Sequence, residues 1–352
     1  MKSSSAMRGR GSAFNPKNRF ESIERVLEPA RDDEVSSPVT RFLPDASKTV
    51  IAFNDSPDVG FDASVNPYRG CEHGCVYCYA RPTHEYLGFS AGLDFETKIM
   101  VKEEAPELLR RELSGPGWEP RVLAMSGVTD CYQPVEKRLE LTRRCLEVLR
   151  EFLNPVVIVT KNFLVTRDVD LLSEMARYRC AAVLISLTTL DPKLSAAMEP
   201  RASRPARRLA AIEALSQAGV PVGFLLAPMI PALTDAEAPQ IAQAAARAGA
   251  RFGGYAPLRL PYGVKELFER WLERHYPEKK DKILNRIRAV RGGKLNDPNF
   301  HSRMRGEGIF AEQMAELFRL ACKKAGIQDQ RPPLSTEHFR RPPGSQLGLF
   351  EP

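Results

Sequence analysis

The 352-residue chain lacks long hydrophobic runs: none approaches the roughly 18 apolar residues of a membrane-spanning helix. Residues 1–20 contain no apolar stretch typical of a signal peptide. No segment repeats at a fixed period. We therefore expect a cytoplasmic protein that does not associate with a membrane.

Cysteine is scarce, with seven residues, and three of them lie between Cys71 and Cys78. An odd count with this clustering favours a metal site in a reducing compartment over a disulfide framework. The net charge of +7 over 352 residues is a mild bias that indicates solubility more than nucleic-acid binding. Basic residues nevertheless gather in two clusters, which fit either solvated helix faces or nucleic-acid contacts: Arg201, Arg204, Arg207 and Arg208, then Arg286, Arg288, Arg291, Lys294, Arg303 and Arg305.

The two ends of the chain differ from its middle. Residues 1–45 are rich in serine, arginine, aspartate and proline without periodicity, and residues 328–352 carry two proline pairs. We predict a disordered basic arm at 1–45 and a disordered tail at 328–352.

Between these ends, short apolar runs alternate with amphipathic helical segments. The brevity and β-branched content of the runs favour buried parallel strands: Ala63–Val65, Arg121–Met125, Val156–Thr160, Ala181–Leu187, Val222–Leu226 and Phe252–Leu258. Strands that alternate with helices predict an α/β fold. We predict a partial (β/α)6 barrel over 46–260 with extra helices over 261–327.

Cys71, Cys75 and Cys78 follow the first of these runs in the spacing C-x3-C-x2-C. A complete cysteine-ligated [4Fe–4S] cluster uses four thiolates, so three would leave one iron open to chelate a substrate and pass it one electron. Gly70 and Gly74 permit the tight backbone that such close ligands need. A structural zinc site is the alternative, with His73, His84 or a distant cysteine as fourth ligand.

This motif, with Tyr77 before its last cysteine, resembles the signature of the radical SAM superfamily. The resemblance implies a [4Fe–4S] cluster on Cys71, Cys75 and Cys78 whose open iron binds S-adenosylmethionine. It also implies reductive cleavage of that molecule to a 5′-deoxyadenosyl radical, with the protein supplying orientation and shielding. The implied partner is a one-electron reductant of the flavodoxin or ferredoxin type.

Over roughly residues 60–260 the chain resembles the branch related to spore photoproduct lyase, which implies DNA as a substrate. The residues that carry this resemblance are Gly70–Ala80, Thr129–Glu136, Thr160–Lys161, Ser186 and Glu199–Arg201. Asp130 and Cys131 are the catalytic candidates. The lyase's hydrogen-donating cysteine precedes its aspartate whereas Cys131 follows Asp130, and this departure argues against the lyase reaction itself.

The resemblance also assigns residues to S-adenosylmethionine. Tyr77 would pack beside the adenine, and Ser126 would meet the amino group, although the usual Gly-Gly-Glu is absent. Lys161 and Ser186 would contact the methionine carboxylate or the ribose, and Arg201 is a second carboxylate candidate. Structural roles are the alternatives: Ser186 bonded to a neighbouring strand, Lys161 in solvent and Arg201 paired with Glu199.

The tail contains Gln346, Leu347, Leu349 and Phe350, which resemble the peptide by which bacterial DNA-processing proteins bind the replication sliding clamp. Its apolar side chains could fill a groove while the tail supplies reach. Three functions remain open: a radical enzyme acting on DNA, one acting on a protein or small molecule, and a non-enzymatic scaffold stapled by an iron–sulfur cluster or zinc.

Overall fold

The computed structural model describes residues 9–21 and 38–342. Its main sheet has seven strands in the order β10-β9-β8-β7-β6-β3-β2, and only the β2–β3 pair is antiparallel. The six parallel strands confirm the predicted partial (β/α)6 barrel. Their bounds are β3 (Ala63–Val65), β6 (Leu123–Met125), β7 (Val156–Thr160), β8 (Ala181–Ser186), β9 (Val222–Met229) and β10 (Phe252–Pro257), and β2 is Ile51–Phe53.

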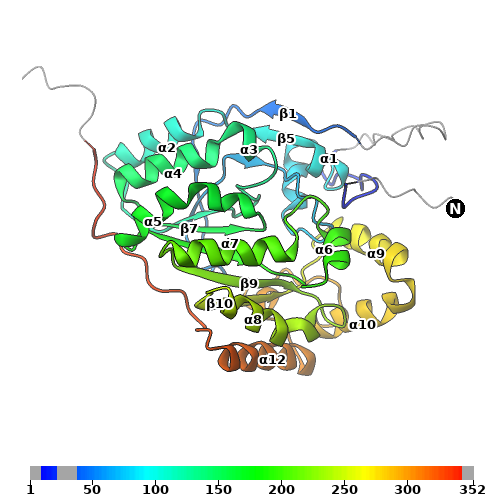
Figure 1. Ribbon diagram of the computed structural model, residues 1–352. Helices are drawn as coiled ribbons and strands as arrows, with labels where there is room; N and C mark the ends of the chain where they lie inside the picture. Colours follow the sequence, from blue (N-terminus) through cyan, green and yellow to red (C-terminus); the bar gives the residue numbers. More distant parts are fainter. Residues whose placement is uncertain (1–8, 22–37, 343–352) are drawn as a thin grey trace, which may run out of the picture.

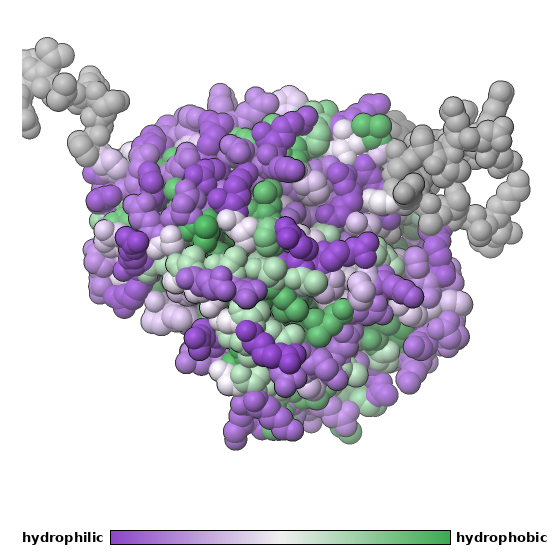
Figure 2. Space-filling view, viewed as in Figure 1, coloured by the Kyte–Doolittle hydropathy of each residue, from purple (hydrophilic) through white to green (hydrophobic). Residues whose placement is uncertain are grey.

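Helices between successive strands cover the outside of this sheet (Figure 1). They are α2 (Ala105–Ser114), α4 (Leu141–Phe152), α5 (Val169–Arg177), α6 (Pro192–Met198), α7 (Pro205–Gln217) and α8 (Ala238–Arg247). Helix α4 shows why they form: Leu141, Cys145, Leu149 and Phe152 recur at helical spacing and are all buried. Figure 2 shows strongly hydrophilic side chains over α2 and α4, and paler ones across the middle of this face.

A second, three-stranded sheet stands beside the barrel, in the order β1-β5-β4. It consists of β1 (Arg41–Pro44), β4 (Tyr68–Arg69) and β5 (Lys98–Val101). Short helices accompany it: η1 (Arg81–Leu87), α1 (Leu93–Thr97) and α3 (Glu136–Leu139). Because β4 leads directly into the cysteine motif, this sheet fixes the start of that loop.

The region after the barrel is helical, as predicted. It contains α9 (Val264–His275), α10 (Lys280–Val290), α11 (Ser302–Arg305) and α12 (Ile309–Ala325). The remaining short turns of helix are η2 (Phe163–Asp168), η3 (Asp235–Glu237) and η4 (Pro277–Lys279). Helix α12 packs against α8, and Phe318 contacts the rings of Phe224 and Tyr255 from the sheet. No helix within the described residues is long and apolar enough to cross a bilayer.

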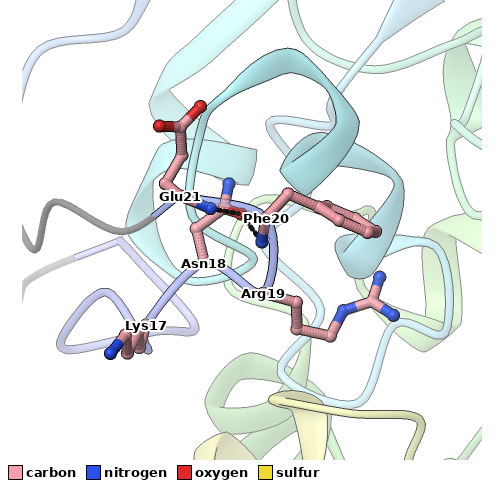
Figure 3. Close-up of a pocket in the computed structure, with 5 residues that line it drawn as sticks. All are labelled: Lys17, Asn18, Arg19, Phe20 and Glu21. Atoms are coloured by element: carbon pink, nitrogen blue, oxygen red, sulfur yellow. Dashed lines mark hydrogen bonds between the residues drawn. The ribbon is translucent and has the colours of Figure 1, made fainter.

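The described part of the N-terminal arm has more structure than the disorder predicted for 1–45. Arg41–Pro44 form β1, and Ser12 is buried. Lys17–Glu21 line a surface hollow of about 470 Å³ (Figure 3), where the Asn18 side chain accepts from the backbone N–H groups of Phe20 and Glu21. Arg19 pairs with Glu85 at 2.6 Å. The Arg19–Glu85 pair joins residues that are distant in sequence, so no local pattern indicates it.

The described part of the tail likewise packs along the barrel. The backbone N–H of Ser335 donates to the carbonyl of Arg179, and that of Arg340 donates to the carbonyl of Phe152. Phe339 packs on Phe152 with ring centroids 6.1 Å apart. The peptide with Gln346, Leu347, Leu349 and Phe350 lies outside the described residues, and its clamp interaction stays a prediction.

Candidate active site

The cysteine loop follows β3 and β4 at the carboxyl edge of the barrel strands, where barrels of this kind carry their chemistry. Cys71 and Cys75 are buried and Cys78 is half-buried. Gly74 has φ of +68°, and a Cβ there would lie 2.7 Å from Glu96 Oε2. The loop therefore requires glycine at this position for both conformation and space.

Gln133 and Thr129 hold the front of the loop. The Gln133 side chain accepts from the Glu72 N–H at 2.9 Å and donates to the Gly70 carbonyl at 3.2 Å. Thr129 donates to the same carbonyl at 2.5 Å. Gln133 is fully buried and does not face an open chamber. Its role is to fix the backbone on both sides of Cys71.

Asp130 ties the middle of the loop to the end of β7. Its carboxylate accepts from Thr160 Oγ1 and from the Lys161 N–H, both at 2.8 Å, and His73 Nδ1 lies 3.3 Å away. Burial opposes ionisation of Asp130, but the facing His73 and these donors lower its pKa to about 2. Asp130 is thus an ionised, fully engaged anchor of the loop.

A buried ion pair holds the back of the loop. Arg81 and Glu96 are both fully buried and their side chains lie 2.5 Å apart. Arg81 also donates to the Cys75 carbonyl at 2.9 Å, while Glu96 accepts from the N–H groups of Gly11 and Ser12. This pair therefore joins the cysteine loop, η1 and the N-terminal arm in one network.

A second buried pair lies under Tyr77. Glu199 pairs with Arg208 and accepts from the hydroxyls of Tyr77 and Thr188. Burial opposes ionisation of Glu199, but Arg208 and Lys161 lower its pKa to about 2. Arg208 is therefore not part of a solvated basic face, since both partners are almost completely buried.

Comparison with known proteins adds the decisive observation. The family model described as "Radical SAM superfamily" matches residues 65–245, about half of the chain. The chain belongs to the radical SAM superfamily. An uncharacterised protein of Mycobacterium tuberculosis is 36% identical over 260 residues, which cover 72% of this chain and 75% of the relative. An uncharacterised protein of Methanocaldococcus jannaschii is 28% identical over 223 residues, covering 63% and 79% of the two chains.

Solved structures place this radical SAM chain near one branch by fold. Spore photoproduct lyase complexed with dinucleoside spore photoproduct superposes with a TM-score of 0.58 at 17% identity, covering 82% of this chain and 81% of the lyase. A variant of that lyase with bound AdoMet and the dinucleoside gives a TM-score of 0.57 at 17% identity, covering 82% and 80%. The fold is that of the predicted branch.

The cofactors of this radical SAM enzyme are a [4Fe–4S] cluster and S-adenosylmethionine, as in its superfamily. Within the described residues, no three histidine, cysteine or carboxylate side chains are grouped as ligands of a single metal ion. All ligands of a zinc site bind the same ion, at metal–ligand distances of about 2.0–2.3 Å. Each thiolate of an iron–sulfur cluster binds a different iron. The ring of His73 is also engaged by Asp130 and Asn162. His73, one of the possible fourth ligands of the zinc alternative, is therefore already engaged by protein partners.

The residues expected to contact S-adenosylmethionine lie at the ends of the barrel strands and in the cysteine loop. Ser126 directly follows β6 with φ of +90°, and its hydroxyl accepts from the Cys131 N–H at 3.0 Å. Lys161 Nζ lies 5.9 Å from the centre of the Tyr77 ring, so these two candidate S-adenosylmethionine-binding residues are neighbours. Ser186 is buried at the end of β8, and its carbonyl accepts from Arg208 at 3.0 Å.

For two candidates, Arg201 and Cys131, the position in the structure differs from the one expected from the sequence. Arg201 pairs with Glu72 at 2.9 Å and not with Glu199, so it lies on the outer side of the cysteine loop. The Cys131 side chain is fully buried within the main hydrophobic core. Burial also raises the pKa of this thiol well above its ordinary value.

At the mouth of the radical SAM barrel, Tyr79 follows Cys78 and keeps 52% of its surface exposed. Its hydroxyl donates to the Gly127 carbonyl at 2.7 Å. Arg259 follows β10 and its guanidinium lies 5.6 Å from the centre of the Tyr79 ring. Arg259 Nε is buried without a partner, and Nη1 contacts only the sulfur of Met304, at 3.4 Å. No carboxylate of the described residues forms an ion pair with this guanidinium.

Proposed function

We propose that this enzyme holds its cluster on Cys71, Cys75 and Cys78, cleaves S-adenosylmethionine reductively and acts on a nucleic acid. The bound cluster would supply one electron, and the cleavage a radical that abstracts hydrogen. The observation that carries the substrate class is the unpaired Arg259 beside the exposed Tyr79, next to Cys78.

The chain's own residues would orient this chemistry. Gln133, Asp130 and Arg81 each bond the cysteine loop from a different element, which limits its movement when a ligand binds. Lys161 can meet a carboxylate, since its ammonium forms no hydrogen bond or ion pair among the described contacts and lies only over the Tyr77 ring. Such a charge-assisted bond is about twice as strong as a neutral one. Buried positions around Cys75 would exclude water from the reacting atoms.

Arg259 and Tyr79 suit a nucleic acid. A guanidinium binds phosphate through two parallel N–H bonds, and an exposed aromatic ring offers a surface for stacking a base, worth about 1–3 kcal/mol. The solved lyase of similar fold has a dinucleoside photoproduct bound. Because Cys131 is in the core and follows the aspartate, we do not extend the proposal to the lyase reaction.

A protein or small-molecule substrate is the competing hypothesis, and one observation favours it. Arg208 and Arg291, one from each basic cluster, are buried. Their guanidinium groups bind partners within the protein: Arg208 pairs with Glu199, and Arg291 donates to the carbonyls of Pro257 and Leu258. Arg303 is engaged by Asp58. Less basic surface is therefore available for phosphates than the sequence suggests.

The enzymatic part is tested by reconstituting the protein anaerobically with iron and sulfide, then adding dithionite and S-adenosylmethionine. We expect 5′-deoxyadenosine, and its loss together with bound iron in Cys78→Ala. Iron-free protein that binds stoichiometric zinc and yields no 5′-deoxyadenosine would refute it.

The substrate class is tested by binding of a labelled single-stranded oligonucleotide. We expect Arg259→Ala to weaken binding about tenfold, as for loss of one charged hydrogen-bonding partner, and to lower the salt dependence by about one phosphate contact. Arg247→Ala, an exposed arginine at the end of α8, is the matched control. Absence of binding at 50 mM salt by wild-type protein would favour the protein or small-molecule alternative.

A further inference from the structure

A groove of about 610 Å³ lies on the outer side of the cysteine loop, between the N-terminal arm, β1 and α3. Three arginines line it, Arg10, Arg138 and Arg201, together with one carboxylate, that of Glu72. None of these residues contacts Tyr79 or Arg259, so the groove is a separate surface from the barrel mouth.

The groove carries excess positive charge. Glu72 is almost completely buried and is paired with Arg201. Arg10 donates to the carbonyls of Glu96 and Pro38 and to the hydroxyl of Thr40, and Arg138 lies 4.9 Å over the ring of Phe42. Neither of these two arginines forms an ion pair with a carboxylate of the described residues. Two guanidinium charges are therefore left to attract an acidic partner.

The groove also presents apolar surface. Val39 is 83% exposed and Phe42 is 37% exposed, and both line it beside Arg138. Arginine and aromatic residues around exposed apolar groups are typical of protein–protein interfaces. A nucleic acid backbone would gain little from the exposed Val39 side chain. The combination therefore favours an acidic protein.

The groove is close to the cysteines. Glu72 adjoins Cys71 in the chain, and the arm crosses the loop so tightly that a Cβ on Gly11 would lie 1.7 Å from the Gly74 carbonyl oxygen. The Arg201 N–H also donates to the His73 carbonyl at 3.2 Å. Only one layer of chain thus separates a bound partner from the loop.

We propose that this groove docks the one-electron donor of the enzyme, an acidic protein that carries a flavin or an iron–sulfur centre. This inference rests on the proposed assignment of the cluster to Cys71, Cys75 and Cys78. One electron leaves the donor and enters the cluster, and no bond forms or breaks. Electron-transfer encounters of this kind use small interfaces, below about 1,200 Å², which suits a single groove.

The test is direct binding of a fluorescently labelled bacterial flavodoxin to the reconstituted enzyme, measured by anisotropy at 50 and 200 mM salt. We expect the dissociation constant to rise about tenfold in Val39→Asp/Arg138→Glu, because electrostatic attraction is lost at the centre of the groove. Wild-type binding should weaken between the two salt concentrations because of screening. Arg247→Glu, the same charge change on α8, should bind like wild type.

A second readout separates this inference from the proposed function. 5′-Deoxyadenosine formation driven by dithionite should be equal in wild type and Val39→Asp/Arg138→Glu, whereas formation driven by reduced flavodoxin should fall about tenfold in the variant. Unchanged flavodoxin binding, or loss of oligonucleotide binding instead, would overturn the docking site while leaving the enzyme assignment intact. No 5′-deoxyadenosine from wild type with dithionite would refute the proposed function, whatever the binding result.

Discussion

Replacing Arg208 by methionine would remove the cationic partner of a carboxylate that water does not reach. Glu199 would keep its bonds from Tyr77 and Thr188 but lose its charge partner. The two side chains are 1% and 0% exposed, so solvent cannot compensate. We expect Arg208→Met to destabilise the protein strongly at neutral pH.

The magnitude follows from Glu199. A fall of its pKa from 4.5 to about 2 corresponds to about 3 kcal/mol of stabilisation at pH 7. Breaking a buried pair by removing one partner typically costs about 3–5 kcal/mol. Because the pKa is lower in the folded state, this stabilisation is present above about pH 4.5 and is lost as the pH falls toward 2. The difference between wild type and variant should therefore narrow between pH 7 and pH 3.

The assay is urea unfolding followed by far-UV circular dichroism on iron-free protein, so that loss of the cluster does not contribute. Glu199→Gln/Arg208→Met is the matched control: with both charges removed, it should recover most of the stability lost by Arg208→Met. A single variant within 1 kcal/mol of wild type at pH 7 would contradict the reasoning. So would a difference that is constant with pH.

Three further predictions concern the cysteine loop and the tail. Gly74→Ala should lose bound iron and about 1–3 kcal/mol of stability, since its Cβ meets Glu96 at a positive φ, whereas Gly117→Ala, with open space around it, should keep both. Gln133→Leu should lower iron retention, measured as iron per chain. It removes the acceptor of the Glu72 N–H and one of the donors to the Gly70 carbonyl, a loss that should cost about 1–3 kcal/mol of stability. A peptide of residues 342–352 should bind the bacterial sliding clamp with micromolar affinity, and its Leu349/Phe350 double-alanine form should not; equal binding of the two would exclude the clamp hypothesis.

The strands were predictable where the sequence is dense in β-branched residues. Val156–Thr160 is found with the predicted bounds, and β8 ends one residue before its prediction. Strand β9 runs to Met229, beyond the predicted end at Leu226, because Met229 still pairs with Pro257 on β10 after a shift in register. A proline at 228 is a reasonable stop signal from sequence alone, and only the neighbouring strand overrides it.

The site was predictable only in part. The cysteine spacing and its aromatic residue indicate the family, but the partners that hold the loop are far away in sequence. No pattern in the sequence singles out Arg81 or Glu96, and Arg208 belongs to a basic cluster that fits either a solvated helix face or nucleic-acid contacts. These residues are buried because segments distant in sequence pack around them, and the hydrophobic periodicity of a single helix or strand does not reveal such packing. Gln133, by contrast, lies within the Thr129–Glu136 stretch that carries the family resemblance, yet its amide faces inward to Gly70.

The described part of the tail lies on the opposite side of the barrel from the cysteine loop. Residues 328–342 cross the side of the barrel where strands begin: Gln328 bridges to Phe252 at the start of β10, and Arg341 donates to the carbonyls of Gly115 and Trp118 ahead of β6. In Figure 1 this segment runs from α12 up the left edge toward α2. The described part of the tail therefore ends on the side of the barrel where the strands begin, opposite the edge that carries the cysteine loop.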